Sequence, residues 1–255
     1  MTSKRASKSD PTGPTPPLGD AIAGGLGKVY GRRSGVALKP SQRDALSQVL
    51  PAVDITARSE AELAHPEGLF APLPVQDLAL EVGYGGGEHL LAQALMAPST
   101  GFIGCEYFIN GVAKICTQIK AHDVQNVRLY GADAKTLFLA LPEASLGAIY
   151  ILFPDPWPKT RHHKRRFISD WTLREMARLL RPGGQLRVAS DIPAYIGWTL
   201  GAIRRHSAFR WTARRPADWS QRPGDWPATR YEAKALTEGR KPIYLEFHRE
   251  RDKAR

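Results

Sequence analysis

Cysteine is nearly absent from this chain of 255 residues, which contains only Cys105 and Cys116. The two do not form a CxxC pair, and they provide no disulfide framework. Cys105 lies in an apolar run and Cys116 on a helical pattern. We therefore expect both to be buried, as small hydrophobic side chains of a protein from a reducing compartment.

Long hydrophobic runs are absent as well. No apolar stretch approaches the roughly 20 residues that a membrane span needs, and the N-terminus lacks the apolar core of a secretory signal. The sequence therefore predicts a cytoplasmic protein with no membrane partner. Hydrophobic residues still make up 42% of the chain, which is enough for a substantial core.

Acidic residues are outnumbered by basic ones. The chain has 25 Asp and Glu against 36 Lys and Arg, so its formal net charge is +11. Lys and Arg that neutralise phosphates release condensed counterions, and this balance is typical of proteins that bind a polyanion. A generally basic surface would give the same composition, so charge alone leaves both interpretations open.

The first 40 residues lack apolar periodicity. They are rich in Ser, Pro, Gly, Lys and Arg ("SKRASKSDPTGPTPPLGD"), with too little apolar surface to offset the entropic cost of ordering. We expect residues 1–40 to form a mostly disordered basic tail, either an arm that contacts nucleic acid or a solubilising extension. Residues 41–255 are expected to form a single domain.

From Leu78 onward, short apolar segments alternate with amphipathic ones. Strands are predicted at 78–83, 102–106, 126–133, 148–153, 185–191, 209–213 and 243–250, and helices at 88–96, 109–122, 134–141, 166–180 and 193–206. Such alternation predicts an α/β, Rossmann-like fold with a mostly parallel sheet and helices on both faces. Ligands bind at the carboxyl ends of the strands in this architecture.

A glycine loop follows the first strand. Gly83, Gly85 and Gly87 fit G-x-G-x-G, which lets the backbone turn sharply and approach a ligand closely. A dinucleotide site or a plain tight turn would also give such a loop. However, Glu88 stands where the dinucleotide fingerprint needs its third glycine, and Glu81 precedes the first glycine by two residues. A carboxylate there suits a cofactor with a sulfonium and an amine better than a pyrophosphate.

Acids also end the next two strands. Glu106 could accept hydrogen bonds from both hydroxyls of a ribose, or be a solvated strand-end acid. Asp133 could read an adenine edge while it caps the following helix. With Glu81 and the glycine loop, these acids resemble the class I S-adenosylmethionine-dependent methyltransferases, over residues 78–248. The resemblance implies a seven-stranded sheet, with Glu81 near the methionine end of the cofactor, Glu106 on the ribose and Asp133 near the adenine.

The fourth strand ends in "FPDPW", with Asp155 between two prolines. Prolines fix φ and remove donors, so this corner should hold the Asp155 carboxylate rigidly at the mouth of the cleft. Base-modifying methyltransferases carry a similar Asp/Asn-Pro-Pro-aromatic motif, in which the polar group grips the base edge. Trp157 would supply the aromatic ring, although a Trp is often a core anchor.

The longer stretch "FPDPWPKTRHHKRR" resembles the signature of tRNA (guanine-N7-)-methyltransferases of the bacterial TrmB type. "ASD", ending at Asp191, and "TRYE", residues 229–232, resemble substrate-binding segments of that family. The resemblance implies methyl transfer from S-adenosylmethionine to N7 of guanine 46 in the variable loop of tRNA, with Asp155 as the catalytic residue. It implies cofactor contacts from Glu81, Gly83, Gly85, Gly87, Glu106, Asp133 and Asp155. It implies substrate contacts from Lys159, Asp191, Thr229, Arg230, Tyr231 and Glu232. It implies RNA contacts from Arg161, His162, His163, Lys164, Arg165 and Arg166.

Methyl transfer to guanine N7 requires few catalytic groups. Guanine N7 carries a lone pair and no proton, so its attack on the methyl group needs orientation rather than a base. A carboxylate that accepts from N1–H and the 2-amino group would stabilise the charge that develops on the purine. Asp155, Asp191 and Glu232 are all candidates for this contact. We expect the neighbouring cations to keep Asp155 ionised.

No metal is expected, because His162 and His163 lack a spaced third ligand. Three other functions remain open at this stage. An amino-methyltransferase acting on adenine or cytosine would share the cleft and the Asp-Pro corner. An NAD-dependent oxidoreductase would share the glycine loop, and a non-catalytic RNA-binding module would share the basic segment. The sequence does not distinguish a monomer from a homodimer.

Overall fold

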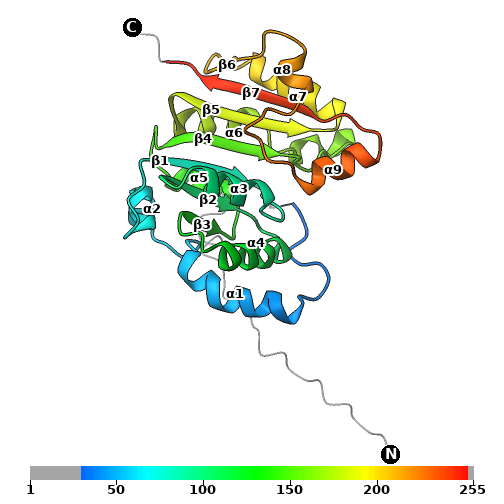
Figure 1. Cartoon of the computed structure of the whole chain (residues 1–255). Coiled ribbons are helices and arrows are strands. Elements are labelled where there is room, and N and C mark those ends of the chain that lie inside the picture. The colour runs from blue at the N-terminus through cyan, green and yellow to red at the C-terminus, as the bar shows by residue number, and fades with distance from the viewer. Residues whose placement is uncertain (1–29, 252–255) are drawn as a thin grey trace, which may run out of the picture.

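The computed structural model describes residues 30–251, and residues 1–29 of the expected tail lie outside this range. The strands form one sheet with the order β3-β2-β1-β4-β5-β7-β6 (Figure 1). They are β1 Asp77–Val82, β2 Thr100–Cys105, β3 Val127–Tyr130, β4 Leu146–Leu152, β5 Leu180–Ser190, β6 Phe209–Trp211 and β7 Ile243–Arg249. Strands β1 to β5 pair in parallel, whereas β7 pairs antiparallel with both β5 and β6. The prediction of a seven-stranded, mostly parallel sheet is confirmed.

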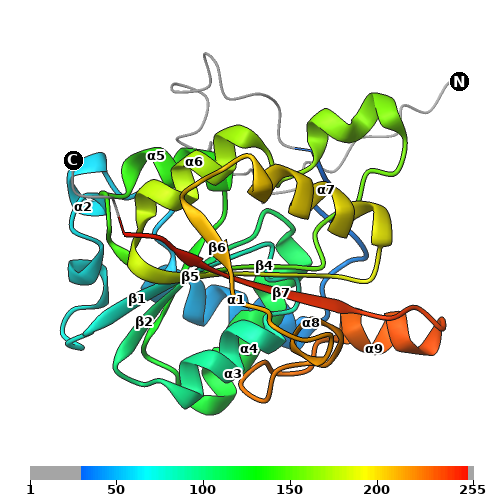
Figure 2. The same ribbon diagram turned by 90° about the horizontal axis from the view of Figure 1, so that it is seen from above.

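Helices cover both faces of this sheet. They are α1 Pro40–Val53, α2 Glu60–Leu63, α3 Glu88–Met96, α4 Ile109–His122, α5 Ala134–Ala140, α6 Asp170–Leu179, α7 Pro193–Arg204, α8 Ala217–Ser220 and α9 Arg230–Thr237, with 3-10 turns η2 Pro66–Phe70 and η3 Thr160–Arg165. Helices α5, α6 and α7 lie on one face, and α3 and α4 on the other (Figure 2). The core is accordingly divided in two, because neighbouring strand residues point to opposite faces. Leu78 and Leu80 join the α5–α7 cluster, whereas Ala79 joins the α3–α4 cluster.

The predicted helices over 88–96 and 109–122 have the bounds that the sequence indicated. The helix predicted over 166–180 starts later, at Asp170, because Ser169 caps it through a capping box with Thr172. It ends before Arg181-Pro182 as expected. The chain does not form a separate loop there: Leu180 already pairs with Leu146, so the Pro-Gly-Gly segment is an irregular start of β5.

Both cysteines are buried and free, as the sequence predicted. Cys116 lies in α4 with no exposed surface. Burial raises the pKa of its thiol to about 12, so it has little thiolate character. Over residues 30–251, no helix combines the length and the apolar character that crossing a membrane would require.

Helix α1 and the packing of residues 30–39 were not predicted from the sequence. Helix α1 packs against α4, and after it Ile55 N donates to Leu129 O (2.9 Å) at the edge strand β3. Within the segment expected to be a disordered tail, the Arg33 carbonyl accepts from Ile109 N at 3.0 Å. The boundary expected near residue 40 is therefore wrong for residues 30–39, which contact the domain.

Gly87 gives a direct test of how the glycine loop is packed. Its φ is +80°, and a Cβ there would lie 2.4 Å from Cδ1 of Ile115 in α4. Gly87→Ala should therefore lower the free energy of unfolding by about 1–3 kcal/mol, from backbone strain and overpacking. Urea denaturation measures this loss. The control is Gly197→Ala in α7, where the added methyl meets nothing within 4 Å. It should be neutral or slightly stabilising, because alanine is the better helix former. Equal stabilities of the two variants would contradict the packing described.

Candidate active site

A cleft of about 900 Å³ opens at the carboxyl ends of β1, β2, β3 and β4. It is lined by the glycine loop, by the acids that end β2 and β3, by the corner after β4, and by two segments from elsewhere in the chain, residues 30–32 and Tyr231. This is the edge of the sheet at which the alternation of strands and helices predicted a ligand site. The volume falls in the range usual for small-molecule sites.

The glycine loop makes up one wall of the cleft. Gly83 and Gly85 both line it, with φ of +72° and +58°, a backbone conformation that L side chains rarely adopt. No atom lies within 4 Å of a Cβ built on Gly83, whereas one on Gly85 would lie 2.8 Å from the Tyr231 ring. The loop can therefore approach a ligand at Gly83, and it is closed by the Tyr231 side chain at Gly85.

Glu106 and Asp133 lie at the ends of their strands and line the cleft as expected. The Glu106 carboxylate accepts from Gly85 N and from Phe108 N, both at 2.9 Å, so it ties the glycine loop to the start of α4. Burial raises the pKa of Glu106, although the hydrogen bonds from backbone N–H groups partly offset this. Asp133 caps α5 by accepting from Lys135 N at 3.0 Å, which confirms that part of the prediction.

Glu81 does not line the cleft. It points to the α3 face of the sheet, where its Oε2 lies 2.7 Å from Nδ1 of His89, and only 3% of its surface is exposed. The His89 ring also packs edge-on against Tyr150, with ring centroids 4.8 Å apart. His89 was not among the predicted site residues, although its place at the start of the helix after the glycine loop could have suggested a partner for Glu81. The pair lies beneath the loop and fixes Glu81 away from solvent.

The corner after β4 is strained as well as rich in proline. Phe153 has φ of +51° and Trp157 φ of +43°, on either side of Asp155. A bulky residue in this region is uncommon, and such strain concentrates at functional sites. Asp155 lines the cleft and has no hydrogen bond or ion pair with any residue between 30 and 251.

The expectation that neighbouring cations hold Asp155 in its charged form is wrong. Partial removal from water raises the pKa of Asp155, with no lowering by any cation. The reason is where the arginines point. Nε of Arg166 donates to the Pro156 carbonyl at 2.9 Å, and its guanidinium lies over the Trp198 ring, 5.0 Å from the centroid. Arg165 lies over the rings of Tyr30 and Trp157, at 4.6 and 5.0 Å.

The basic segment therefore divides into two groups. Lys159, Arg161 and Lys164 are exposed in and beside η3, and their side chains have no hydrogen bond or ion pair with the described residues. His162 and His163 pack edge-on against Trp157 and Trp198, with ring centroids 5.8 and 5.5 Å apart. Slight desolvation and the surrounding cations lower the pKa of His162.

Arg166 was expected to contact RNA, and the structure places it at the wall of the cleft with little exposed surface. Only 6% of the residue is exposed, and its guanidinium lies between the Pro156 carbonyl and the aromatic rings of α7. A side chain in this position stabilises the corner that carries Asp155. The cations of this segment that remain exposed are Lys159, Arg161 and Lys164.

Two of the expected substrate carboxylates already have partners. Asp191 pairs with Nε of Arg240, and it does not line the cleft. Glu232, 6% exposed, accepts from the Tyr244 hydroxyl and lies 3.0 Å from Nε of Arg222.

The "TRYE" segment begins α9. Thr229 caps this helix and forms a capping box with Glu232. Arg230 pairs with Glu88 at 2.9 Å, whereas Tyr231 turns into the cleft. Of these four residues, Tyr231 alone lines the cleft.

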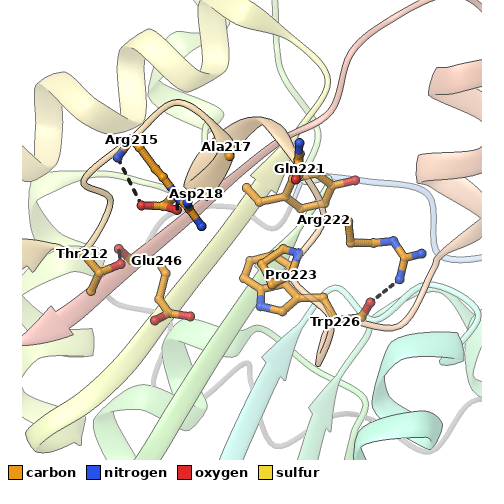
Figure 3. A pocket seen from close by; sticks show the side chains of 10 residues that line it. Thr212, Arg215, Ala217, Asp218, Gln221, Arg222, Pro223, Trp226 and Glu246 are labelled. Carbon is orange, nitrogen blue, oxygen red and sulfur yellow. Dashed lines mark hydrogen bonds and ion pairs between the residues drawn. The ribbon is translucent and has the colours of Figure 1, made fainter.

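A second cavity of about 320 Å³ lies between α8 and β7 (Figure 3). Its charged side chains are paired: Nε of Arg215 lies 3.1 Å from Asp218, and Oε2 of Glu246 lies 3.1 Å from Nε of the buried Arg187. Arg187 also pairs with Asp225 at 2.6 Å. The Arg187–Asp225 pair joins residues 212–226 to the sheet, whereas Arg215–Asp218 lies within that segment and Arg187–Glu246 joins β5 to β7.

Arg166 and Lys164 provide a matched test of the two groups of cations. Arg166→Ala should lower the free energy of unfolding by about 1.5–3 kcal/mol, because it leaves the Pro156 carbonyl without its charged donor. Lys164→Ala should change it by less than about 0.5 kcal/mol, as at other exposed sites. Chemical denaturation followed by circular dichroism measures both. Similar small effects of the two substitutions would contradict the structural role of Arg166.

Comparison with known proteins shows the family of the chain. A family model described as "Putative methyltransferase" matches residues 75–245. A tRNA (guanine-N(7)-)-methyltransferase of Rhodospirillum rubrum is 50% identical over 224 residues, 87% of this chain and 88% of that one. One of Nitrobacter hamburgensis is 46% identical over 253 residues, 98% of each chain.

Solved structures are similar at the level of the fold. The 16S rRNA methyltransferase KamB aligns with a TM-score of 0.54 at 18% identity, over 76% of this chain and 94% of that one. An antibiotic-related methyltransferase aligns with a TM-score of 0.51 over the same shares of the two chains, also at 18% identity. The strand order, the glycine loop and the sequence relatives together show that this chain belongs to the tRNA (guanine-N(7)-)-methyltransferase family and has the class I methyltransferase fold.

Proposed function

We propose that this protein transfers a methyl group from S-adenosylmethionine to N7 of guanine 46 in the variable loop of tRNA. Family membership supports the reaction. The observation that carries the residue assignment is Asp155, an unpaired carboxylate on a strained corner that faces the cleft. Asp191 and Glu232, the other two candidates for the guanine edge, are occupied by Arg240 and by Tyr244 and Arg222.

The cleft has the chemistry that S-adenosylmethionine requires. Each Glu106 oxygen accepts one hydrogen bond from the backbone and keeps a further lone pair for a ribose hydroxyl. Asp133 lies at the neighbouring strand end, where an adenine would lie, and Gly83 leaves room for close approach. When bound, the cofactor supplies an electrophilic methyl group.

Glu81 would support the cofactor site without contacting the cofactor. Because its carboxylate is buried against His89 and does not line the cleft, it would act on the cofactor by holding the glycine loop. Gly87 would act in the same way, since a Cβ there would lie 2.4 Å from Cδ1 of Ile115, whereas Gly85 lines the cleft and would contact the cofactor with Gly83.

Asp155 would recognise the guanine. As an ionised carboxylate it accepts two hydrogen bonds, which match the N1–H and 2-amino donors on one edge of the base. This contact leaves N7, on the opposite side of the purine, free to attack, and it stabilises the positive charge that develops there. Trp157 and Tyr231 line the same cleft and would pack against the base.

The exposed cations would hold the RNA. Lys159, Arg161 and Lys164 lie directly after the corner that carries Asp155, so phosphates bound there lie beside the base that enters the cleft. Such contacts position the RNA without reading its sequence. An amino-methyltransferase on adenine or cytosine is less well supported, since the relatives named above are guanine-N(7) enzymes.

The test is a methyl-transfer assay with labelled S-adenosylmethionine and unmodified tRNA, followed by nucleoside analysis. We expect label in 7-methylguanosine, with chain cleavage at position 46 after borohydride and aniline. A tRNA with adenine at position 46 is the control and should accept no label. Label on an exocyclic amino group would overturn the proposed reaction, and 7-methylguanosine at another position would overturn the proposed site.

Asp155→Asn separates catalysis from binding. We expect transfer to fall by about 100-fold or more, since one preorganised electrostatic contact is lost. Binding of tRNA by filter retention should change little.

The same substitution should change the free energy of unfolding. Because the folded state raises the pKa of Asp155 above its ordinary 3.8, the charged form opposes folding at neutral pH. The variant should thus be more stable than wild type at pH 7, and the difference should vanish below the ordinary pKa. Wild-type transfer by the variant would remove Asp155 from the mechanism.

The exposed cations call for a separate variant. Replacing Lys159, Arg161 and Lys164 together by Ala should weaken tRNA binding and reduce the slope of log K against log salt by about one per lost phosphate contact. Affinity for S-adenosylhomocysteine should not change. Arg204→Ala is the control, because Arg204 is an exposed cation at the last residue of α7 and does not line the cleft. An unchanged salt slope in the triple variant would place the RNA elsewhere.

A further inference from the structure

Residues 30–36 lie outside the region that the methyltransferase family model covers, and the first three of them line the cleft. At one end of this segment, Tyr30 packs edge-on against Trp157, with centroids 6.0 Å apart, and carries the Arg165 guanidinium on its face. At the other end, Gly35 and Val36 contact Asn110 in the first turn of α4. One end of the segment therefore contacts residues that come after β4, and the other end contacts a residue that comes after β2.

The strand order fixes what lies between these contacts. Strand β1 pairs with β2 on one side and with β4 on the other, so a segment that joins the loops after β2 and β4 must pass over the loop after β1. That loop is the glycine loop. Consistent with this path, Gly31 and Arg32 line the cleft together with Gly83 and Gly85.

Asn110 holds the far end by a reciprocal pair of hydrogen bonds. Its Oδ1 accepts from Gly35 N at 2.8 Å, and its Nδ2 donates to the Val36 carbonyl at 2.7 Å. The Arg33 carbonyl accepts from Ile109 N, and the Arg33 guanidinium lies 5.3 Å from the centroid of the Tyr107 ring. A Cβ on Gly35 would lie 2.8 Å from Cζ of Phe108, so only glycine allows this approach without a shift.

We propose that residues 30–36 form the outer wall of the methyl-donor cleft and that Asn110 is the residue that positions this wall. This inference rests on the proposed function, since it takes the cleft as the site of S-adenosylmethionine. A donor bound between the glycine loop and the wall is enclosed by both. Bound product, S-adenosylhomocysteine, should therefore favour the position of the wall that the structure shows.

The first experiment measures binding of S-adenosylhomocysteine to the full chain by calorimetry. Asn110→Ala removes both hydrogen bonds and lowers the fraction of molecules with the wall in place, so binding should weaken by about threefold to tenfold. Gly35→Val should weaken binding to a similar extent, because the added side chain forces residues 30–36 away from Phe108. The control is Gln125→Ala, which removes an exposed side-chain hydrogen bond to Asp123 and should leave the affinity unchanged.

The second experiment follows tryptic cleavage after Arg32 and Arg33 by mass spectrometry. S-Adenosylhomocysteine should slow cleavage at these two sites in the wild type, and the protection should be lost in Asn110→Ala. If the wild type binds the product but the wall sites show no protection, or if Asn110→Ala and Gly35→Val both bind with wild-type affinity, the inference is wrong while the proposed function stands. If the wild type binds no S-adenosylhomocysteine, the proposed function fails and the inference fails with it.

Discussion

Parallel pairing of β1 with both β2 and β4 is the constraint on which the rest of the structure depends. It brings the loops after these three strands together at the carboxyl ends of the strands, where ligands bind in such sheets. The Glu106 carboxylate then binds the glycine loop to the start of α4 through two backbone N–H groups. The strand order thus determines where the cleft lies, and the side chains determine its lining.

Much of this could be predicted from the sequence, because the signals are local. Apolar runs of strand length, glycines at fixed spacing and acids at strand ends are all visible without knowing what contacts what. The same local signals located Glu106, Asp133 and Asp155 in one cleft. They also gave the bounds of α3 and α4, whose periodic apolar residues face a continuous core.

The partners of charged side chains could not be predicted in this way. Glu232 meets Arg222 and Tyr244, Asp191 meets Arg240, and Arg166 meets rings of α7, and none of these contacts follows from residue spacing. A run of cations in a sequence does not say which guanidiniums face solvent. Residues 30–36 were missed for a related reason: a short polar segment gains order only from contacts with a surface formed by distant residues.

The contacts of Arg166 bear on the distance between Asp155 and the exposed cations. Its hydrogen bond to the Pro156 carbonyl and its contact with Trp198 join the corner that carries Asp155 to the rigid helix α7, and η3 begins four residues after Pro156 and ends at Arg165. The exposed cations and the carboxylate therefore belong to one stiff unit. If the exposed cations bind phosphates as proposed, this unit would set the separation between a bound phosphate and the base that enters the cleft.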